Sequence, residues 1–220
     1  MTNKSKQTLG EEIANSISHG IMAVFGIVSL ILLIIKSNTR KEYLSAFVFG
    51  ISIIMLYTMS TIYHSMKYGG TAKNVFKRMD HLSIYVLIGG TFAPALLLLP
   101  ALQTPIFNNI QWMEKGITLF VIQWILISVG IVFKSVWINR YSKLHVFLFL
   151  LMGWSALIFV GDLYKYNETA FYLILFGGVA YSLGVIFYAL PQIKYFHFIW
   201  HIFTAIGTIL QFIAIYNYLY

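Results

Sequence analysis

Long apolar runs separated by short polar segments dominate the chain. A helix needs about 20 apolar residues to cross the hydrocarbon core of a bilayer, and seven runs come close to this length or exceed it. The connections are short, so consecutive helices are expected to be antiparallel neighbours. The pattern predicts one all-α domain, residues 1–220: a polytopic membrane protein with a bundle of seven transmembrane helices after a loose polar segment, residues 1–10. The predicted spans are 17–35, 44–64, 79–99, 117–134, 144–160, 170–190 and 196–218.

The composition agrees with this pattern. Hydrophobic residues make up 59% of the chain and charged residues 10%, whereas ordinary soluble domains contain about 25% charged residues. A soluble protein of this length could not bury so much apolar surface in one core, so lipid is the expected solvent. No cleavable signal peptide is expected, because Lys4 and Lys6 are followed by the acidic pair Glu11 and Glu12 and not by an apolar run.

Basic residues are distributed unequally between the two sides of the predicted bundle. Of the 15 lysine and arginine residues, ten fall on the side of the N-terminus and five on the other side. The positive-inside rule therefore predicts a cytoplasmic N-terminus and an outer C-terminus. The net charge of +8 comes from these short connections, where membrane proteins collect basic residues, so no nucleic-acid partner is expected.

All six histidines map to the predicted cytoplasmic half of the membrane. His197 and His201 are spaced i, i+4, which places both imidazoles on one face of a helix, about one turn apart. His64, at the end of the second span, is expected at the same depth on another helix. The chain contains no cysteine, so these histidines predict a zinc site with nitrogen ligands and one open position. Another ion that accepts histidine, or a packed polar cluster without metal, fits the same pattern.

Asp80 and Ser60 are the candidates for chemistry beside this site. Asp80 and His81 open the third span and point about 100° apart on a helix, so only one of them can face the metal squarely. We expect Asp80 to face it, as a general base for a water molecule, with His81 turned to a neighbour or to the interface. Ser60 lies one turn before His64, and its hydroxyl either supports the site or bonds back to its own helix.

A stripe of polar residues leads into the first predicted span. Glu12, Asn15 and His19 are spaced i, i+3 and i+7 and therefore share one face of a helix. They are interpreted as residues that support the metal ligands, or as a capping and anchoring segment in which the helix dipole favours glutamate. His145 has no partner in the pattern and is expected to be solvated or packed.

These residues belong to segments that resemble a known family. The resemblance runs along nearly the whole chain, to the bacterial hemolysin III proteins and, more distantly, to the progestin and adipoQ receptors, which include the adiponectin receptors. A bacterial plasma membrane is the implied location. The matching segments are Glu12–Asn15 through His19–Gly20, Ser60–His64, Met79–His81, Ile84–Tyr85 through Gly90–Pro94, Met152–Trp154, Gly177–Tyr181, and His197 through Trp200–Phe203.

The resemblance implies a seven-helix bundle with zinc at its cytoplasmic side. In the receptor branch, zinc is bound by the histidine of a serine-x-x-x-histidine motif and by both histidines of a histidine-x-x-x-histidine motif. An aspartate on the third helix holds the water at the metal. His81 departs from this pattern, since the receptor branch usually has tyrosine there. The matching positions in this chain are Ser60, His64, Asp80, His197 and His201.

Three functions remain open at this point. The wider superfamily includes the alkaline ceramidases and implies a zinc-dependent intramembrane hydrolase, with a membrane lipid amide or ester as substrate. The alternative is a non-enzymatic sensor or regulator of membrane state, in which zinc holds the second, third and seventh helices together. The hemolysin III name implies a cytolysin, which the uniformly apolar spans disfavour because a water-filled channel needs a polar face. The oligomeric state is not predicted.

Overall fold

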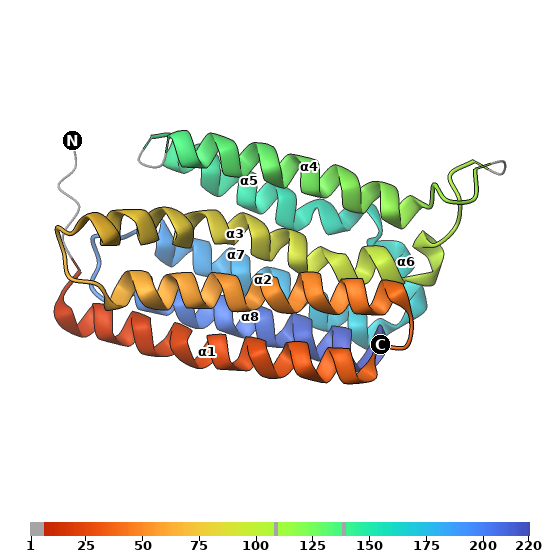
Figure 1. Cartoon of the computed structure of the whole chain (residues 1–220), viewed down its shortest axis with the longest axis horizontal. Coiled ribbons are helices and arrows are strands. Elements are labelled where there is room, and N and C mark those ends of the chain that lie inside the picture. Colours follow the sequence, from red (N-terminus) through yellow and green to blue (C-terminus); the bar gives the residue numbers. More distant parts are fainter. Residues whose placement is uncertain (1–6, 108–109, 138–139) are drawn as a thin grey trace.

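The computed structural model describes residues 7–107, 110–137 and 140–220. Within these ranges the chain is built of helices, and its β pairing is limited to an isolated bridge between Pro105 and Glu114. The long helices lie side by side along the molecule (Figure 1), which confirms the predicted all-α membrane protein. Six helices are long and apolar enough to cross a membrane: α1 (Leu9–Lys36), α2 (Arg40–Ser65), α3 (Thr71–Leu98), α4 (Lys115–Val136), α7 (Glu168–Tyr188) and α8 (Phe196–Tyr218).

The fifth predicted span, 144–160, is broken in the structure. Helix α5 (Ser142–Trp154) continues through a 3-10 turn (Ser155–Ile158) into the short helix α6 (Val160–Tyr166). The two parts are bent by 52°, and counted as one span they complete the predicted seven. The prediction missed the bend and the added length, because an apolar run records how much chain lipid can accept and not the hydrogen-bond pattern within it. A 3-10 turn inside a helix often marks a local break of this kind.

Two helices begin about two turns earlier than predicted. Helix α1 starts at Leu9 and not at residue 17, and α3 starts at Thr71 and not at residue 79. Gly10 is therefore helical, whereas residues 1–6 of the predicted loose segment lie outside the described residues. The prediction placed both starts too late because hydropathy detects only the apolar part of a helix, and the first turns of these two are polar.

Helix α1 buries polar side chains and exposes apolar ones. Its buried face includes Glu12, Asn15 and His19, whereas Ile21 and Ile35 are 65% and 76% exposed. A surface helix of a water-soluble protein has the opposite arrangement. The inverted arrangement suits a helix whose outer face meets lipid, because ionisable groups in a membrane must turn toward the protein.

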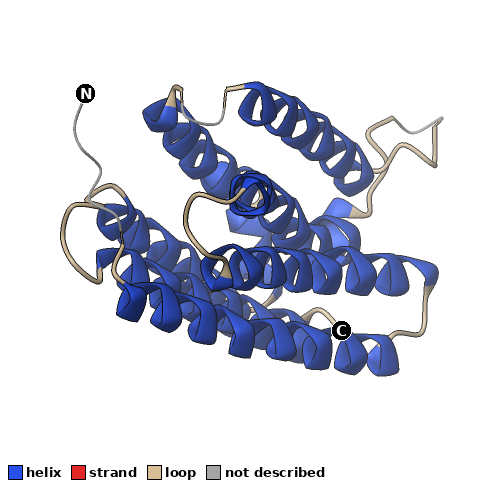
Figure 2. Cartoon of the chain, turned by 60° about the vertical axis from the view of Figure 1, so that its left-hand side comes forward, coloured by secondary structure: helices blue, strands red, loops and turns tan. Residues whose placement is uncertain are grey.

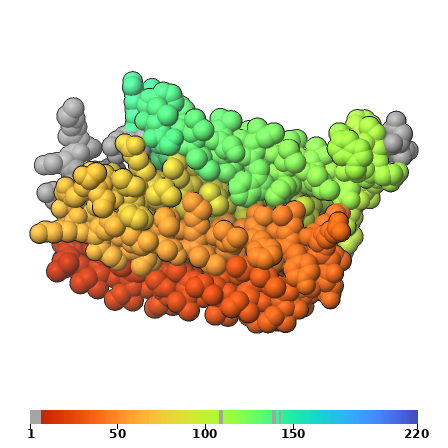
Figure 3. All heavy atoms as spheres, in the orientation of Figure 1, coloured from red at the N-terminus to blue at the C-terminus, as the bar shows by residue number. Residues whose placement is uncertain are grey.

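The helices pack side by side, with α2 and α3 in the interior of the bundle. Helix α1 lies against α2 and α8, α2 against α3, α3 against α4, and α7 against α8. Loops join the helices at the two ends of the bundle (Figure 2), and the face drawn in Figure 3 shows α1, α2, α3 and α4 in successive bands. Helix α2 lies between α1 and α3 and contributes fully buried large side chains, among them Phe49, Ile53 and Tyr57.

One end of the bundle collects the histidines, and we call it the histidine end. Helices α1, α3, α5 and α8 begin there and α2 ends there, as the course of the chain in Figure 1 shows. The C-terminus lies at the opposite end. All six histidines are in the half of the bundle next to the histidine end, as the sequence predicted.

The positive-inside rule predicts that the histidine end faces the cytoplasm. Since the chain contains no cysteine, single introduced cysteines can report the orientation. The exposed residues Asn38 and Lys67 lie at opposite ends of α2. In intact cells, a membrane-impermeant maleimide is expected to label Asn38→Cys, and to label Lys67→Cys only after the membrane is permeabilised. Labelling of Lys67→Cys alone in intact cells would reverse the orientation.

Gly90 is expected to be required for the close contact between α2 and α3. A Cβ atom at Gly90 would lie 1.9 Å from Ser52 Oγ and 3.1 Å from the carbonyl oxygen of Val48, so Gly90→Ala forces the two helices apart. We expect a loss of about 1–3 kcal/mol in the free energy of unfolding, measured by denaturation in detergent. Gly178→Ala is the control, because a Cβ atom there meets nothing within 4 Å. Equal losses in both variants would contradict this role of Gly90.

Candidate metal centre

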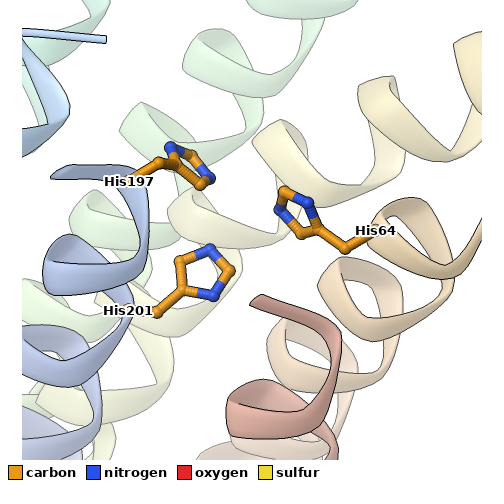
Figure 4. Close-up of side chains that lie close together, drawn as sticks. All are labelled: His64, His197 and His201. Atoms are coloured by element: carbon orange, nitrogen blue, oxygen red, sulfur yellow. The ribbon is translucent and has the colours of Figure 1, made fainter. Parts of the chain in front are cut away.

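Three histidines from two helices meet near the histidine end. His64 lies in the last turn of α2, and His197 and His201 lie in the first two turns of α8. One ring nitrogen of each residue lies within 4.8 Å of the other two, and the ring centroids are 4.7, 5.0 and 5.2 Å apart. Figure 4 shows the imidazoles gathered between the facing helices. These are the three residues that sequence spacing and depth placed together.

The start of α8 is tied to the start of α1. Tyr195, directly before α8, has a left-handed backbone with φ of 62°, a conformation that a residue other than glycine keeps only where its surroundings hold it. The Tyr195 N–H donates a 2.7 Å hydrogen bond to the Glu11 carboxylate. The same carboxylate accepts a hydrogen bond from the N–H of Thr8, the cap of α1. Glu11 therefore holds two helix starts together and fixes the position of His197 along the axis of the bundle.

Helix α1 supplies hydrogen-bond acceptors to two of the three histidines. His64 Nδ1 lies 2.7 Å from Glu12 Oε2, and His201 Nδ1 lies 3.3 Å from the backbone carbonyl oxygen of Asn15. A ring nitrogen that faces an acceptor carries the proton, so Nδ1 donates in both rings and Nε2 keeps its lone pair. Histidines that bind metals in proteins are usually held in this way. Both rings are therefore prepared to offer Nε2 to an ion.

The third residue of the polar stripe, His19, supports a candidate ligand. Its ring stacks on that of His201, with centroids 3.5 Å apart and planes 8° apart, and it meets Tyr57 edge-on at 4.8 Å. Its Nε2 lies 3.5 Å from Thr204 Oγ1. The group of three nitrogens that could share one ion does not include His19. His19 therefore lies beside this group and contacts one of its members, His201.

A cavity of about 170 Å³ adjoins the histidines. Its polar end is lined by His197 and His201 together with Asp80 and Ser60, and its other walls come mainly from apolar side chains of α3, α5, α6 and α7. Ser60 Oγ is buried and makes no hydrogen bond to any residue that the structure describes. The bond back to its own helix, which the sequence left open as one interpretation, is thus not formed. Its hydroxyl is available to the cavity.

The two remaining histidines lie outside the group of three. His81 Nδ1 is 2.6 Å from the carbonyl oxygen of Lys77, and the side chain also lines the cavity next to Asp80. His145 is buried and joined to the Tyr85 hydroxyl through Nδ1 at 2.9 Å. Of the two environments that the sequence left open for His145, the structure therefore shows the packed one.

Sequence reasoning missed Lys73, which it counted only as a connection charge. Lys73 lies in the first turn of α3, is buried, and donates a 2.7 Å hydrogen bond to Glu12 Oε1. The i, i+7 spacing from Lys73 to Asp80 places both on one helix face and could have indicated the position of Lys73.

Tyr68, in the connection between α2 and α3, lies near the same carboxylate. Burial and the charge of Glu12 raise the pKa of the Tyr68 hydroxyl above its usual value.

Known proteins resemble this chain over nearly its whole length. The family model described as Haemolysin-III related matches residues 7–212. Hemolysin-3 homolog from Bacillus subtilis (strain 168) is 38% identical over 215 residues, which covers 96% of this chain and 95% of the relative. Hemolysin-3 from Bacillus cereus is 37% identical over 217 residues, with 96% and 93% covered.

A more distant relative comes from animals. The monocyte to macrophage differentiation factor of Homo sapiens is 28% identical over 220 residues, which covers 98% of this chain and 87% of the relative. This match supports the link to a wider superfamily that the sequence motifs indicated. The family-model match includes every candidate residue of the metal centre, from Glu12 to His201. The chain therefore belongs to the haemolysin-III-related family of multi-pass membrane proteins.

Proposed function

We propose that this protein is a zinc-dependent intramembrane hydrolase that acts on amide or ester bonds of membrane lipids. One observation carries the proposal: His197 and His201 of the histidine cluster line the polar end of a mainly apolar cavity, which Asp80 and Ser60 also line. Small-molecule sites commonly combine apolar walls with a few converging polar groups. An enzyme that cleaves a lipid near its headgroup needs this combination.

The donor set suits zinc. Three imidazole nitrogens leave the fourth position of a tetrahedral ion open, as in catalytic zinc sites. Zn–N bonds of about 2.0–2.1 Å require the three nitrogens to lie closer together than the 4.8 Å limit, which small rotations of the rings would allow. When bound, zinc supplies a Lewis acid that polarises a carbonyl group and lowers the pKa of water to about 7.

Asp80 is the proposed general base, and Ser60 the proposed hydrogen-bond donor. In hydrolysis the water oxygen adds to the acyl carbon, and the bond from this carbon to the leaving nitrogen or oxygen breaks. Asp80 accepts the proton of the water and returns it to the leaving amine or alcohol. The Ser60 hydroxyl, which has no partner among the described residues, donates a hydrogen bond to the acyl oxygen as negative charge develops there.

The volume and lining of the cavity favour a slender substrate. Its volume of about 170 Å³ is below the range of about 300–1,000 Å³ that is typical for pockets of drug-sized ligands. Apolar side chains, among them Ile84, Leu87, Leu150 and Leu175, form most of its wall. A single acyl chain matches these walls, with its amide or ester group at the polar end.

A non-enzymatic regulator is the second candidate, and the contacts of α1 favour it. Because Glu12 and Asn15 hold candidate ligands on α2 and α8, a bound ion would stabilise one arrangement of three helices. The names of the bacterial relatives suggest a cytolysin as a third candidate. Among the described residues, the buried ionisable side chains gather at the histidine end, whereas a water-filled pore would need them along the length of the helices.

Metal content is the first measurement to make. We expect detergent-purified protein to carry about one zinc ion per chain, as a site of this kind holds, when the metal is measured by mass spectrometry. His197→Ala/His201→Ala is expected to lose it, because two of three ligands are gone. His145→Gln is the control, since His145 lies at the same end but outside the group of three. Folded wild-type protein that takes up no zinc would exclude the hydrolase.

Catalysis is tested separately with Asp80→Asn. This variant keeps the three histidines, so we expect it to retain zinc but to lose about 10²- to 10⁴-fold in turnover of a lipid amide or ester, the range for removal of a general base. Turnover is measured with a panel of both lipid classes in vesicles. Asp162→Asn, which changes an aspartate of α6 far from the cavity's polar end, is the matched control. Zinc-loaded wild type that turns over none of these lipids would favour the regulator.

A further inference from the structure

The Glu12 carboxylate is divided between two buried partners. Oε2 accepts the hydrogen bond of His64 Nδ1 at 2.7 Å, and Oε1 accepts that of Lys73 Nζ at 2.7 Å. Glu12, His64 and Lys73 are 6%, 3% and 5% exposed. Three helices meet in this contact, because Glu12 belongs to α1, His64 to α2 and Lys73 to α3.

The geometry at His64 indicates what the contact does. With Nδ1 bound to a carboxylate, the ring cannot rotate freely about its side-chain bonds, and its proton is fixed on Nδ1. The other nitrogen, Nε2, is buried and has no hydrogen-bond partner within the described ranges of the chain. A buried nitrogen with an unused lone pair is costly in a protein. An ion held together with His197 and His201 would use it.

Lys73 has its own set of contacts around the connection between α2 and α3. Its ammonium also donates to the carbonyl oxygen of Met66, at 3.0 Å, directly after the end of α2. It lies over the ring of Tyr63 at 4.9 Å and over that of Tyr68 at 4.2 Å, both cation–π contacts. Lys73 therefore links Glu12 to the connection 66–70, which lies at the surface of the histidine end.

We propose that Glu12 and Lys73 form a positioning pair for His64, which sets the affinity of the metal centre and couples metal binding to the order of the connection 66–70. Glu12 fixes the proton and the plane of the His64 ring, and Lys73 holds Glu12 in place. The inference rests on the proposed metal site, and it is independent of whether the protein hydrolyses lipids.

A purely structural ion pair would behave differently. Replacing a buried ion pair by well-packed apolar groups is often harmless to stability, and a pair that only joins helices has no reason to change the affinity for an ion. A pair that orients a ligand changes this affinity even in a folded, stable variant. Residues in this position typically alter metal affinity by about 10- to 100-fold when they are mutated.

The test measures zinc affinity in the purified full-length protein by competition with a chelating dye. Glu12→Gln is expected to weaken zinc binding about 10- to 100-fold. The amide is neutral, and only one of its two terminal atoms accepts hydrogen bonds, so it cannot hold His64 and Lys73 as the carboxylate does. Lys73→Met is expected to weaken it less, because Glu12 still reaches His64. The matched control is the ion pair of Lys41 and Glu114, 2.6 Å apart at the opposite end of the bundle. Lys41→Met and Glu114→Gln are expected to bind zinc as wild type does.

A double-mutant cycle separates positioning from a general effect on the fold. If Glu12 acts through His64, the effect of Glu12→Gln on zinc affinity disappears when His64 is already replaced in His64→Ala. The neutral variant Glu12→Gln/Lys73→Gln leaves no unpaired charge in the interior, so it keeps the test valid if a single substitution prevents folding. It is expected to fold and still to bind zinc more weakly than wild type.

Hydrogen exchange of the backbone amides tests the coupling to the connection. In wild type, zinc is expected to slow exchange in residues 66–70, and in Lys73→Met this slowing is expected to be lost. Zinc binding of wild-type strength in both Glu12→Gln and the neutral double variant would overturn the inference and leave the metal site intact. Wild type that binds no zinc would overturn both together, whereas absence of lipid turnover bears only on the proposed hydrolase.

Discussion

The structure depends on the fact that lipid cannot solvate a charged group. An ion buried without a partner costs several kcal/mol even after the protein relaxes around it, so each ionisable side chain that a helix carries into the membrane has to face other polar groups of the protein. This constraint explains why α1 turns Glu12, Asn15 and His19 inward and isoleucines outward. It also explains why the carboxylate of Glu12 has two cationic or hydrogen-bonding partners at 2.7 Å, His64 and Lys73.

From this constraint follows the concentration of polar chemistry at one end of the bundle. Glu11 joins the starts of α1 and α8, and Glu12 joins α1 to α2 and α3. The candidate ligands His64 and His201 are then held from the same helix, on adjacent turns of α1. A short polar segment before the first apolar run thus organises the candidate metal centre, although it contributes none of the three candidate ligands.

Much of the candidate metal centre could be predicted from the local geometry of helices. The pair His197 and His201 needs only the periodicity of a helix, and His64 joins them once antiparallel spans are assumed. The starts of α1 and α3 were placed too late, because their first turns are polar and only tertiary contacts bury them. The same limit hid Lys73: a lysine near a span end reads as a topology signal, and its ion pair with Glu12 joins residues 61 positions apart.

Other features could not be read from the sequence because two physical outcomes share one pattern. A serine one turn before a histidine can bond to its own helix or face a cavity, and only the packing of neighbouring helices decides, as it does for Ser60. Asp80 and His81 point about 100° apart, so only one of them was expected to face a single metal ion. Both can line the cavity, because its wall is extended. The break in the fifth span after Trp154 reflects a change in backbone hydrogen bonding, which hydropathy does not detect.

The composition of the histidine cluster has a consequence for how it would behave in a cell. Its candidate ligands are nitrogen atoms, and the whole chain lacks cysteine. Oxidants release metals from many sites by converting thiolates to disulfides or sulfenic acids, and here they find no sulfur ligand to attack. The occupancy of this centre would therefore follow the supply of the metal and the competition from other chelators, and it would not fall through oxidation of a thiolate ligand.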